Sequence, residues 1–120
     1  MRSMDVVLAH NDKKSAQALA GLLHKVFRSV QVVGSVDDLR SAIARNRARL
    51  VITDLETIGF KQIEELRREF DVEIVCTHRI PDESMWTKAL GLGALDCCHT
   101  SDVQAIIQAV NRNMSRSHAA

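Results

Sequence analysis

Apolar residues recur along the chain in two alternating patterns. Five short apolar runs have the length of β-strands, and most of them are rich in Val and Ile. They cover residues 5–9, 30–34, 49–53, 72–76 and 95–98. The last run, LDCC, is the weakest by strand propensity. Nearly continuous apolar runs of this kind are typical of a parallel sheet that is covered on both faces.

Between these runs, apolar residues return every three or four positions, as they do on one face of a helix. The stripes are Ala16, Leu19, Leu22, Leu23, Val26 and Phe27; Val36, Leu39 and Ile43; Phe60, Ile63, Leu66 and Phe70; Met85 and Leu90; and Val103, Ile106, Ile107, Val110 and Met114. The fourth helix is expected to start after Pro81 and to end near Gly91 and Gly93. Ser35-x-x-Asp38 and Ser101-x-x-Gln104 resemble capping boxes.

The alternation predicts an α/β fold of the (βα)5 type, with right-handed crossovers in a doubly wound, five-stranded parallel sheet. A chain of 120 residues fits one domain, so we expect residues 1–120 to form a single unit with a core from about 5 to 114. The apolar periodicity ends after Met114, and the tail beyond it is expected to fray.

Composition and charge indicate an ordinary globular protein. Hydrophobic residues make up 46% and the net charge is +1, which gives no indication of a nucleic-acid partner. The three cysteines lack the spacing of a disulfide framework, which favours reduced thiols in a cytoplasmic protein. Cys97 and Cys98 are expected to face opposite sides of a strand. No run approaches the roughly 18 apolar residues of a membrane span, and no signal peptide is evident.

Polar residues follow four of the predicted strands. They are residues 10–12 (HND), Asp54, residues 77–79 (THR) and residues 99–101 (HTS). In an open doubly wound sheet, ligands bind outside the carboxyl ends of the strands. Any chemistry is therefore expected at this edge.

Asp54 after the third strand and Thr77 after the fourth are accompanied by Gly59-Phe60 and by GALD at residues 93–96. In this order and spacing, the chain resembles the response-regulator receiver domain of bacterial two-component signalling. The resemblance covers about residues 5–114 and implies the flavodoxin-like strand order 2-1-3-4-5. It implies that Asp54 accepts a phosphoryl group and that Thr77 is the switch hydroxyl. A sensor histidine kinase or phosphotransfer protein is then the expected donor, and an effector domain or protein the expected partner, with a homodimer as a further option.

The resemblance also implies a Mg²⁺ ion, held by Asp54, by acids after the first strand and by the backbone carbonyl of Glu56. Here the acidic positions carry His10 and Asn11, with Asp12 one residue later. Asn11 offers an amide oxygen, but it lacks the charge that a hard cation favours, and imidazole is a poor ligand for Mg²⁺. We therefore expect weakened Mg²⁺ binding, with Asn11, Asp54 and Glu56 as the candidate ligands.

Other departures from the receiver pattern also weaken the expected phosphoryl site. Thr100 stands at the position of the usual lysine, Cys97 replaces the usual aromatic residue, and the loop LETI after Asp54 is short. Phosphoryl transfer builds negative charge, so the loss of cations weakens the pocket. The sequence thus predicts an atypical receiver, and a phosphorylation-independent interaction domain is the main alternative.

Several local alternatives stay open. Residues 10–12 are equally suited to capping a helix, and His10, His78 and His99 at one edge suggest a Zn²⁺ or pH-sensing site. DLETIG echoes the haloacid-dehalogenase phosphatases, with Asp54 as nucleophile and Glu56 as acid/base, but no later acidic pair follows, so we do not expect an enzyme. A flavin site is disfavoured because no Gly-rich loop follows the first strand. Trp86 is either an interface residue or partly buried.

Overall fold

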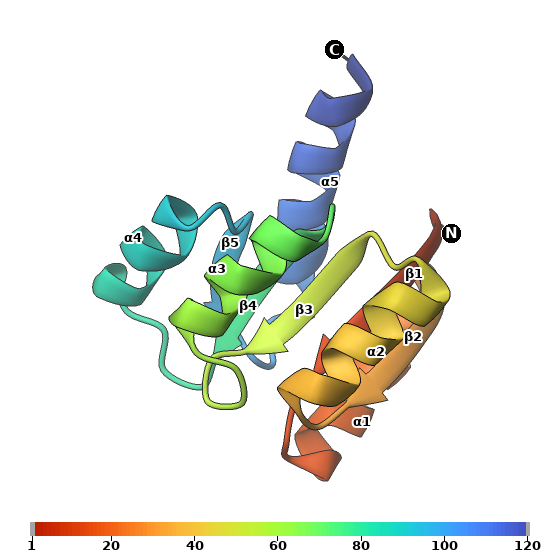
Figure 1. The fold of residues 1–120 in the computed structure, drawn as a ribbon, viewed down its shortest axis with the longest axis horizontal. Coiled ribbons are helices and arrows are strands. Elements are labelled where there is room, and N and C mark those ends of the chain that lie inside the picture. Colours follow the sequence, from red (N-terminus) through yellow and green to blue (C-terminus); the bar gives the residue numbers. More distant parts are fainter. Residues whose placement is uncertain (1, 120) are drawn as a thin grey trace.

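In the computed structural model, strands and helices alternate along the whole chain (Figure 1). The structure describes residues 2–119, and side chains for residues 4–113. The elements are β1 (Arg2–Ala9), α1 (Lys13–Leu23), β2 (Phe27–Val33), α2 (Val36–Asn46), β3 (Leu50–Asp54), α3 (Phe60–Glu69), β4 (Glu73–His78), α4 (Glu83–Gly91), β5 (Asp96–His99) and α5 (Val103–Ala119). The predicted (βα)5 order is confirmed.

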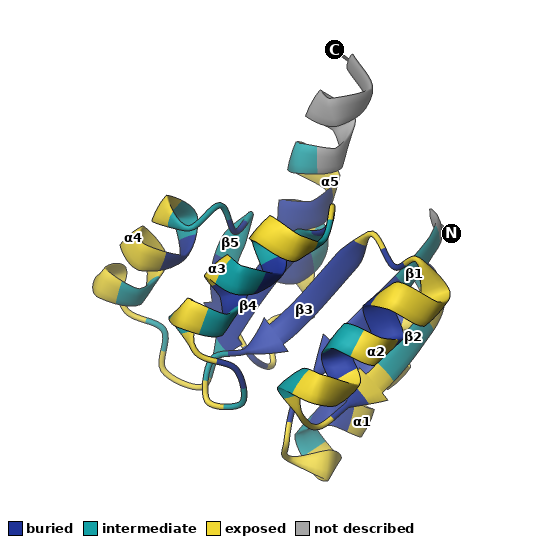
Figure 2. Cartoon of the chain, in the orientation of Figure 1, coloured by how far each residue is buried: buried dark blue, intermediate teal, exposed yellow. Residues whose placement is uncertain are grey.

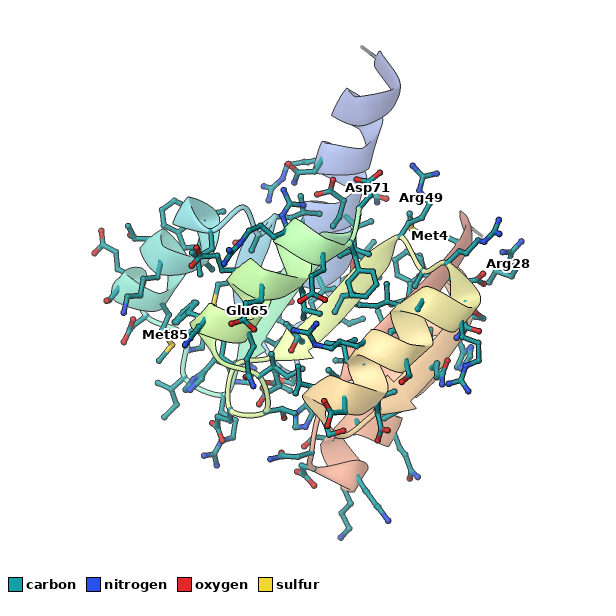
Figure 3. The ribbon with its side chains drawn as sticks, in the orientation of Figure 1. Met4, Arg28, Arg49, Glu65, Asp71 and Met85 are labelled. Atoms are coloured by element: carbon teal, nitrogen blue, oxygen red, sulfur yellow. The ribbon has the colours of Figure 1, made fainter. Side chains whose placement is uncertain are left out.

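The strands form one parallel sheet in the order β2-β1-β3-β4-β5, which confirms the predicted topology. Parallel strands end at the same edge, so Asp54 pairs with Thr77 and His78 pairs with His99. Arg49 and Asp71 precede β3 and β4 and lie at the opposite edge (Figure 3). The register therefore gathers the polar strand ends in one place.

Helices bury both faces of the sheet, and their outer surfaces are exposed (Figure 2). Val51 of β3 belongs to the cluster that α2, α3 and α4 cover, whereas Leu50 and Ile52 belong to the cluster that α1 and α5 cover. Cys97 lies in the first cluster and Cys98 in the second, as the alternation of a strand requires. All five residues of β3 are buried.

The end of α1 differs from the prediction. The helical stripe was extended to Val26 and Phe27, but α1 ends at Leu23 and Phe27 begins β2, where its side chain is fully buried. The backbone N–H groups of Lys25 and Val26 donate to the carbonyls of Leu22 and Leu23, which closes a tight turn. Apolar residues on both sides of this turn happened to preserve the helical spacing.

One of the two predicted helix caps is correct. The Ser35 hydroxyl accepts a hydrogen bond from the Asp38 N–H at 3.2 Å, as the capping motif predicts. The cap proposed at Ser101 is wrong, because α5 starts at Val103 and the Asp102 carboxylate accepts from the Ala105 N–H at 3.1 Å. Ser101 instead directs its own N–H to the Nδ1 atom of His99.

The helical backbone of α5 extends to Ala119, past the end of the apolar periodicity at Met114. Side chains from residue 114 onward lie outside the described residues, so the predicted fraying of the tail stays a prediction. The single-domain assignment to residues 1–120 likewise stays a prediction. None of the helices in the described part of the chain is long and apolar enough to cross a membrane.

The cap of α5 gives a direct test of the corrected helix start. Asp102→Ala should lower the free energy of unfolding by about 1 kcal/mol, because a first-turn N–H loses its acceptor. The matched change Ser101→Ala should cost less than about 0.5 kcal/mol, as for most surface substitutions. Urea denaturation followed by circular dichroism measures both values. Equal losses from the two variants would contradict this assignment.

Candidate functional site

Asp54 ends the central strand β3 and is only 2% exposed. The short loop after it folds back tightly, because the Asp54 carbonyl accepts from the N–H groups of both Thr57 and Ile58 at 3.0 Å. The fully buried side chain of Ile58 anchors this turn in the core. The shortened loop therefore holds the carboxylate against the sheet edge.

The Asp54 carboxylate is surrounded by neutral hydrogen-bond donors. Its Oδ1 atom accepts from the Thr77 hydroxyl at 3.3 Å and from the Thr100 hydroxyl at 3.4 Å, and both threonines are buried. Its Oδ2 atom accepts from the Glu56 N–H at 3.1 Å. The structure thus brings together three of the predicted site residues, Asp54, Thr77 and Thr100.

His10 is the next neighbour of the carboxylate. Its side chain is buried, with the residue 7% exposed, and its Nδ1 atom accepts from the Asp12 N–H at 3.0 Å. This bond leaves the ring proton on Nε2, which lies 3.8 Å from Asp54 Oδ1. No hydrogen-bond partner reaches Nε2 among the described residues. An imidazole N–H group therefore lies near the carboxylate, at a position where the resemblance places an acid.

Asn11 and Asp12 lie at the rim of the site. Asn11 is exposed, and its backbone N–H donates to the Thr57 hydroxyl at 2.9 Å, which ties the β1–α1 loop to the β3–α3 loop. Asp12 occupies the N-cap position of α1, and its carboxylate accepts from the Ser15 hydroxyl at 2.7 Å. That hydrogen bond is the main reason that the pKa of Asp12 is lowered.

Glu56 and Arg79 form an ion pair beside Asp54. The guanidinium of Arg79 donates to both carboxylate oxygens of Glu56, at 2.9 and 3.2 Å, and His78 Nε2 lies 3.5 Å from Glu56 Oε1. The Arg79 hydrogen bond is the largest cause of the lowered pKa of Glu56. Sequence reasoning missed this pair, although the signal was present: Asp54 and Thr77 are paired in register, and Glu56 and Arg79 each follow two positions later.

These residues line a small cavity of about 170 Å³. Typical sites for organic ligands occupy roughly 300–1,000 Å³, so this cavity suits a phosphoryl-sized group better than a nucleotide or a flavin. Its lining residues are His10, Asn11, Asp12, Ser15, Asp54, Glu56 and Arg79.

The described residues do not fit a receiver-type Mg²⁺ site. Within the described part of the chain, no group of three or more His, Cys, Asp or Glu side chains is placed to hold a metal ion. The positions where the resemblance places acids carry His10, whose Nδ1 atom already accepts the Asp12 N–H, and Asn11, which has no charge. The weakened Mg²⁺ binding expected from the sequence stays a prediction.

The three histidines at this edge share one arrangement. The Nδ1 atoms of His10, His78 and His99 accept from the N–H groups of Asp12, Ile80 and Ser101, each two residues further along the chain. Each ring is therefore fixed by its own loop, and the structure describes no cluster of them that would bind Zn²⁺. Their shared role in the described chain is to shape loops at the carboxyl edge.

No family model matches the sequence, and no curated protein matches it. Three solved structures resemble the fold of the chain. Among solved structures, the receiver domain of the Francisella response regulator 1452 is 17% identical with a TM-score of 0.82, over 96% of this chain and 99% of that one. The beryllofluoride-activated N-terminal receiver domain of RstA from Klebsiella pneumoniae is 23% identical with a TM-score of 0.77, over 90% of this chain and 95% of that one.

The chain has the receiver fold. A third structure, the signal receiver domain of a DNA-binding response regulator from Colwellia psychrerythraea, agrees at 15% identity and a TM-score of 0.75, over 91% of this chain and 99% of that one. On the receiver fold, Asp54 stands at the carboxyl end of the third strand of the chain and Thr77 at the end of the fourth. The fold is thus similar throughout.

The three cysteines are buried in the core, and none of them lines the cavity beside Asp54. Burial raises the pKa of Cys76 and Cys98 to about 12, and it also raises the pKa of Cys97. The thiolate is the reactive form of cysteine. All three thiols are free and buried, so the folded chain holds them in an inert state near neutral pH.

The inertness of the thiols is open to direct measurement. At about pH 8, we expect no appreciable reaction of the folded chain with an aromatic disulfide reagent, because all three thiols are buried and burial raises the pKa of each, to about 12 for Cys76 and Cys98. In urea, all three cysteines should react, and Cys97→Ser should lose one equivalent. Absorbance of the released thiolate gives both numbers. A fast stoichiometric reaction in the folded state would contradict the assignment.

Proposed function

We propose that the chain is a receiver-type signalling module in which Asp54 accepts a phosphoryl group. The observation that carries the proposal is the buried Asp54 carboxylate with two hydroxyls, those of Thr77 and Thr100, on the same oxygen. Such donors are placed to bind phosphoryl oxygens as negative charge develops. A histidine kinase or a phosphotransfer protein would supply the group, and a protein partner would read the result.

The proposed output surface is the face of α4, β5 and α5. Trp86 on α4 is 47% exposed, which favours the interface role over partial burial. Its indole N–H donates to Asp96 Oδ1 at 3.0 Å, and Arg112 of α5 lies 3.4 Å from the other oxygen of Asp96. Three elements thus meet at one carboxylate, so a shift of β5 would change how Trp86 is presented.

A second candidate is an interaction module that works without phosphorylation. It is favoured because the Thr77 hydroxyl already contacts Asp54 in the unmodified chain. Cys97 also stands where the resemblance places an aromatic residue, and its small side chain is buried. In this second candidate, the partner would bind the same surface whether or not Asp54 is phosphorylated.

We propose that the chain is not an enzyme. In a phosphatase of the haloacid-dehalogenase type, Glu56 would act as a general acid. Here Arg79 binds both oxygens of Glu56 and lowers its pKa, which disfavours the protonated form that a general acid needs. Asp54 is therefore proposed as an acceptor of one group rather than as a residue that turns over a substrate.

The acceptor role predicts labelling by a small phosphoryl donor. Incubation with phosphoramidate should add one phosphoryl group to the folded chain, detectable by intact-protein mass spectrometry and removed by hydroxylamine, which cleaves acyl phosphates. Asp54→Asn should abolish the label, whereas Asp71→Asn at the opposite edge of the sheet should leave it unchanged. Equal labelling of the Asp54→Asn variant would remove Asp54 from this role.

The switch predicts a linked change on α4. Trp86 is the only tryptophan, so its indole N–H gives one resolved signal in a ¹⁵N–¹H spectrum. On labelling of Asp54, this signal and the amide signal of Thr77 should both move, because β4 and β5 connect the two sites. A labelled chain whose Trp86 signal stays in place would support the phosphorylation-independent candidate over the switch.

A further inference from the structure

The pocket around Asp54 disagrees with the metal chemistry that the receiver resemblance implies. We propose that Asp54 accepts its phosphoryl group without a divalent cation, and that His10 and Arg79 bind the phosphoryl oxygens in place of the metal and the lysine. This inference rests on the proposed acceptor role of Asp54. The resemblance gives the binding of the phosphoryl oxygens to a Mg²⁺ ion and to a lysine, and Thr100 stands at the position of that lysine here.

His10 supplies the first donor. Its Nδ1 atom accepts the Asp12 N–H, so the ring proton is on Nε2, which lies 3.8 Å from Asp54 Oδ1. The Nε2 atom is buried and has no hydrogen-bond partner in the described chain, which is costly in a protein interior. At 3.8 Å from Oδ1 it is too far for a hydrogen bond to the carboxylate itself. A group bound to Asp54 that adds oxygens would give this donor a partner.

Arg79 supplies the positive charge. It is the one residue lining the 170 Å³ cavity that carries a permanent positive charge. Its side chain is 75% exposed and its ion pair with Glu56 lies at the surface, where such pairs contribute little to stability. The guanidinium can therefore exchange Glu56 for a phosphoryl dianion at small cost. Its fork of N–H groups matches phosphate oxygens in a bidentate manner.

The reaction balances without a metal ion. A lone pair of one Asp54 carboxylate oxygen forms a bond to the phosphorus of a phosphoramidate, such as a phosphohistidine. The P–N bond breaks, and its electron pair stays on nitrogen, which takes up a proton from solvent. The product is an acyl phosphate dianion on Asp54 and a neutral amine or imidazole. His10, Arg79, Thr77 and Thr100 then surround the dianion with donors.

The test compares phosphoramidate labelling in EDTA with labelling in excess Mg²⁺, using the full chain and intact-protein mass spectrometry. The unmodified chain should be labelled at rates that agree within about twofold in the two buffers. In EDTA, Arg79→Gln should slow labelling by roughly tenfold, the size expected for one charged hydrogen bond. Arg79→Lys, which keeps the charge, should recover part of that loss. Arg28→Gln is the matched control, because Arg28 forms a similar pair with Asp5 at the β1–β2 edge (Figure 3).

A second pair of variants tests His10 through its N–H group. His10→Gln places an amide N–H at a similar reach and should keep most of the labelling rate, whereas His10→Leu should slow it by several-fold. Circular dichroism and thermal melts confirm that each variant is folded. If His10→Leu fails to fold, the comparison of His10→Gln with the unmodified chain still applies, since a large loss there would overturn the role of the N–H.

The outcomes separate this inference from the proposed function. Labelling that requires Mg²⁺, or that is unaffected by Arg79→Gln, overturns the metal-free inference and leaves Asp54 as the acceptor. Absence of labelling in both buffers overturns the acceptor role, and the inference falls with it. Labelling in EDTA that depends on Arg79 and is rescued by Arg79→Lys supports both.

Discussion

A carboxylate buried at the end of a central strand is the constraint to which the rest of this site responds. Asp54 is 2% exposed, at the end of a strand that lies between β1 and β4. An uncompensated buried charge is very costly, so hydrogen-bond donors must surround it. The two threonine hydroxyls and one backbone N–H meet this need in the described structure, and all three are neutral. The neighbouring loops are shaped by the positions that these donors must take.

The same constraint explains where the full charges lie. The cations and anions of the site do not touch Asp54; they pair with each other just outside it, as Glu56 and Arg79 do. This separation follows from register, because equal offsets from the paired residues Asp54 and Thr77 bring the two side chains together. A metal ion beside Asp54 would share the cavity with His10, whose Nε2 atom lies 3.8 Å from Asp54 Oδ1. The Asp54 carboxylate is thus satisfied by neutral donors, and Arg79 is the one permanently charged cation among the residues that line the cavity.

Sequence patterns were sufficient for the fold and for the members of the site that lie on strand ends. Asp54, Thr77 and Thr100 converge because parallel strands end at one edge, a property of topology that needs no side-chain detail. The patterns were insufficient where a single hydrogen bond decides the outcome. The nitrogen that carries the His10 ring proton depends on the Asp12 N–H, and the start of α5 depends on whether Ser101 or Asp102 caps it. Phe27 was misplaced because a tight turn kept the helical spacing of apolar residues intact.

If the face of α4, β5 and α5 is the output surface as proposed, no aromatic side chain of β5 connects it to the pocket, because β5 carries two buried thiols in the middle of its four residues. Thr77 is paired in register with Cys98, and Cys98 is two positions from Asp96, the residue that binds the Trp86 indole. Movement of Thr77 can therefore reach Trp86 only through the β4–β5 backbone register or through packing of the small side chains between them. Close-packed cores resist small continuous shifts, and coupling requires an element with two discrete arrangements. In this chain the element best placed for that role is α4, which has few buried residues and meets β5 at the Trp86–Asp96 hydrogen bond.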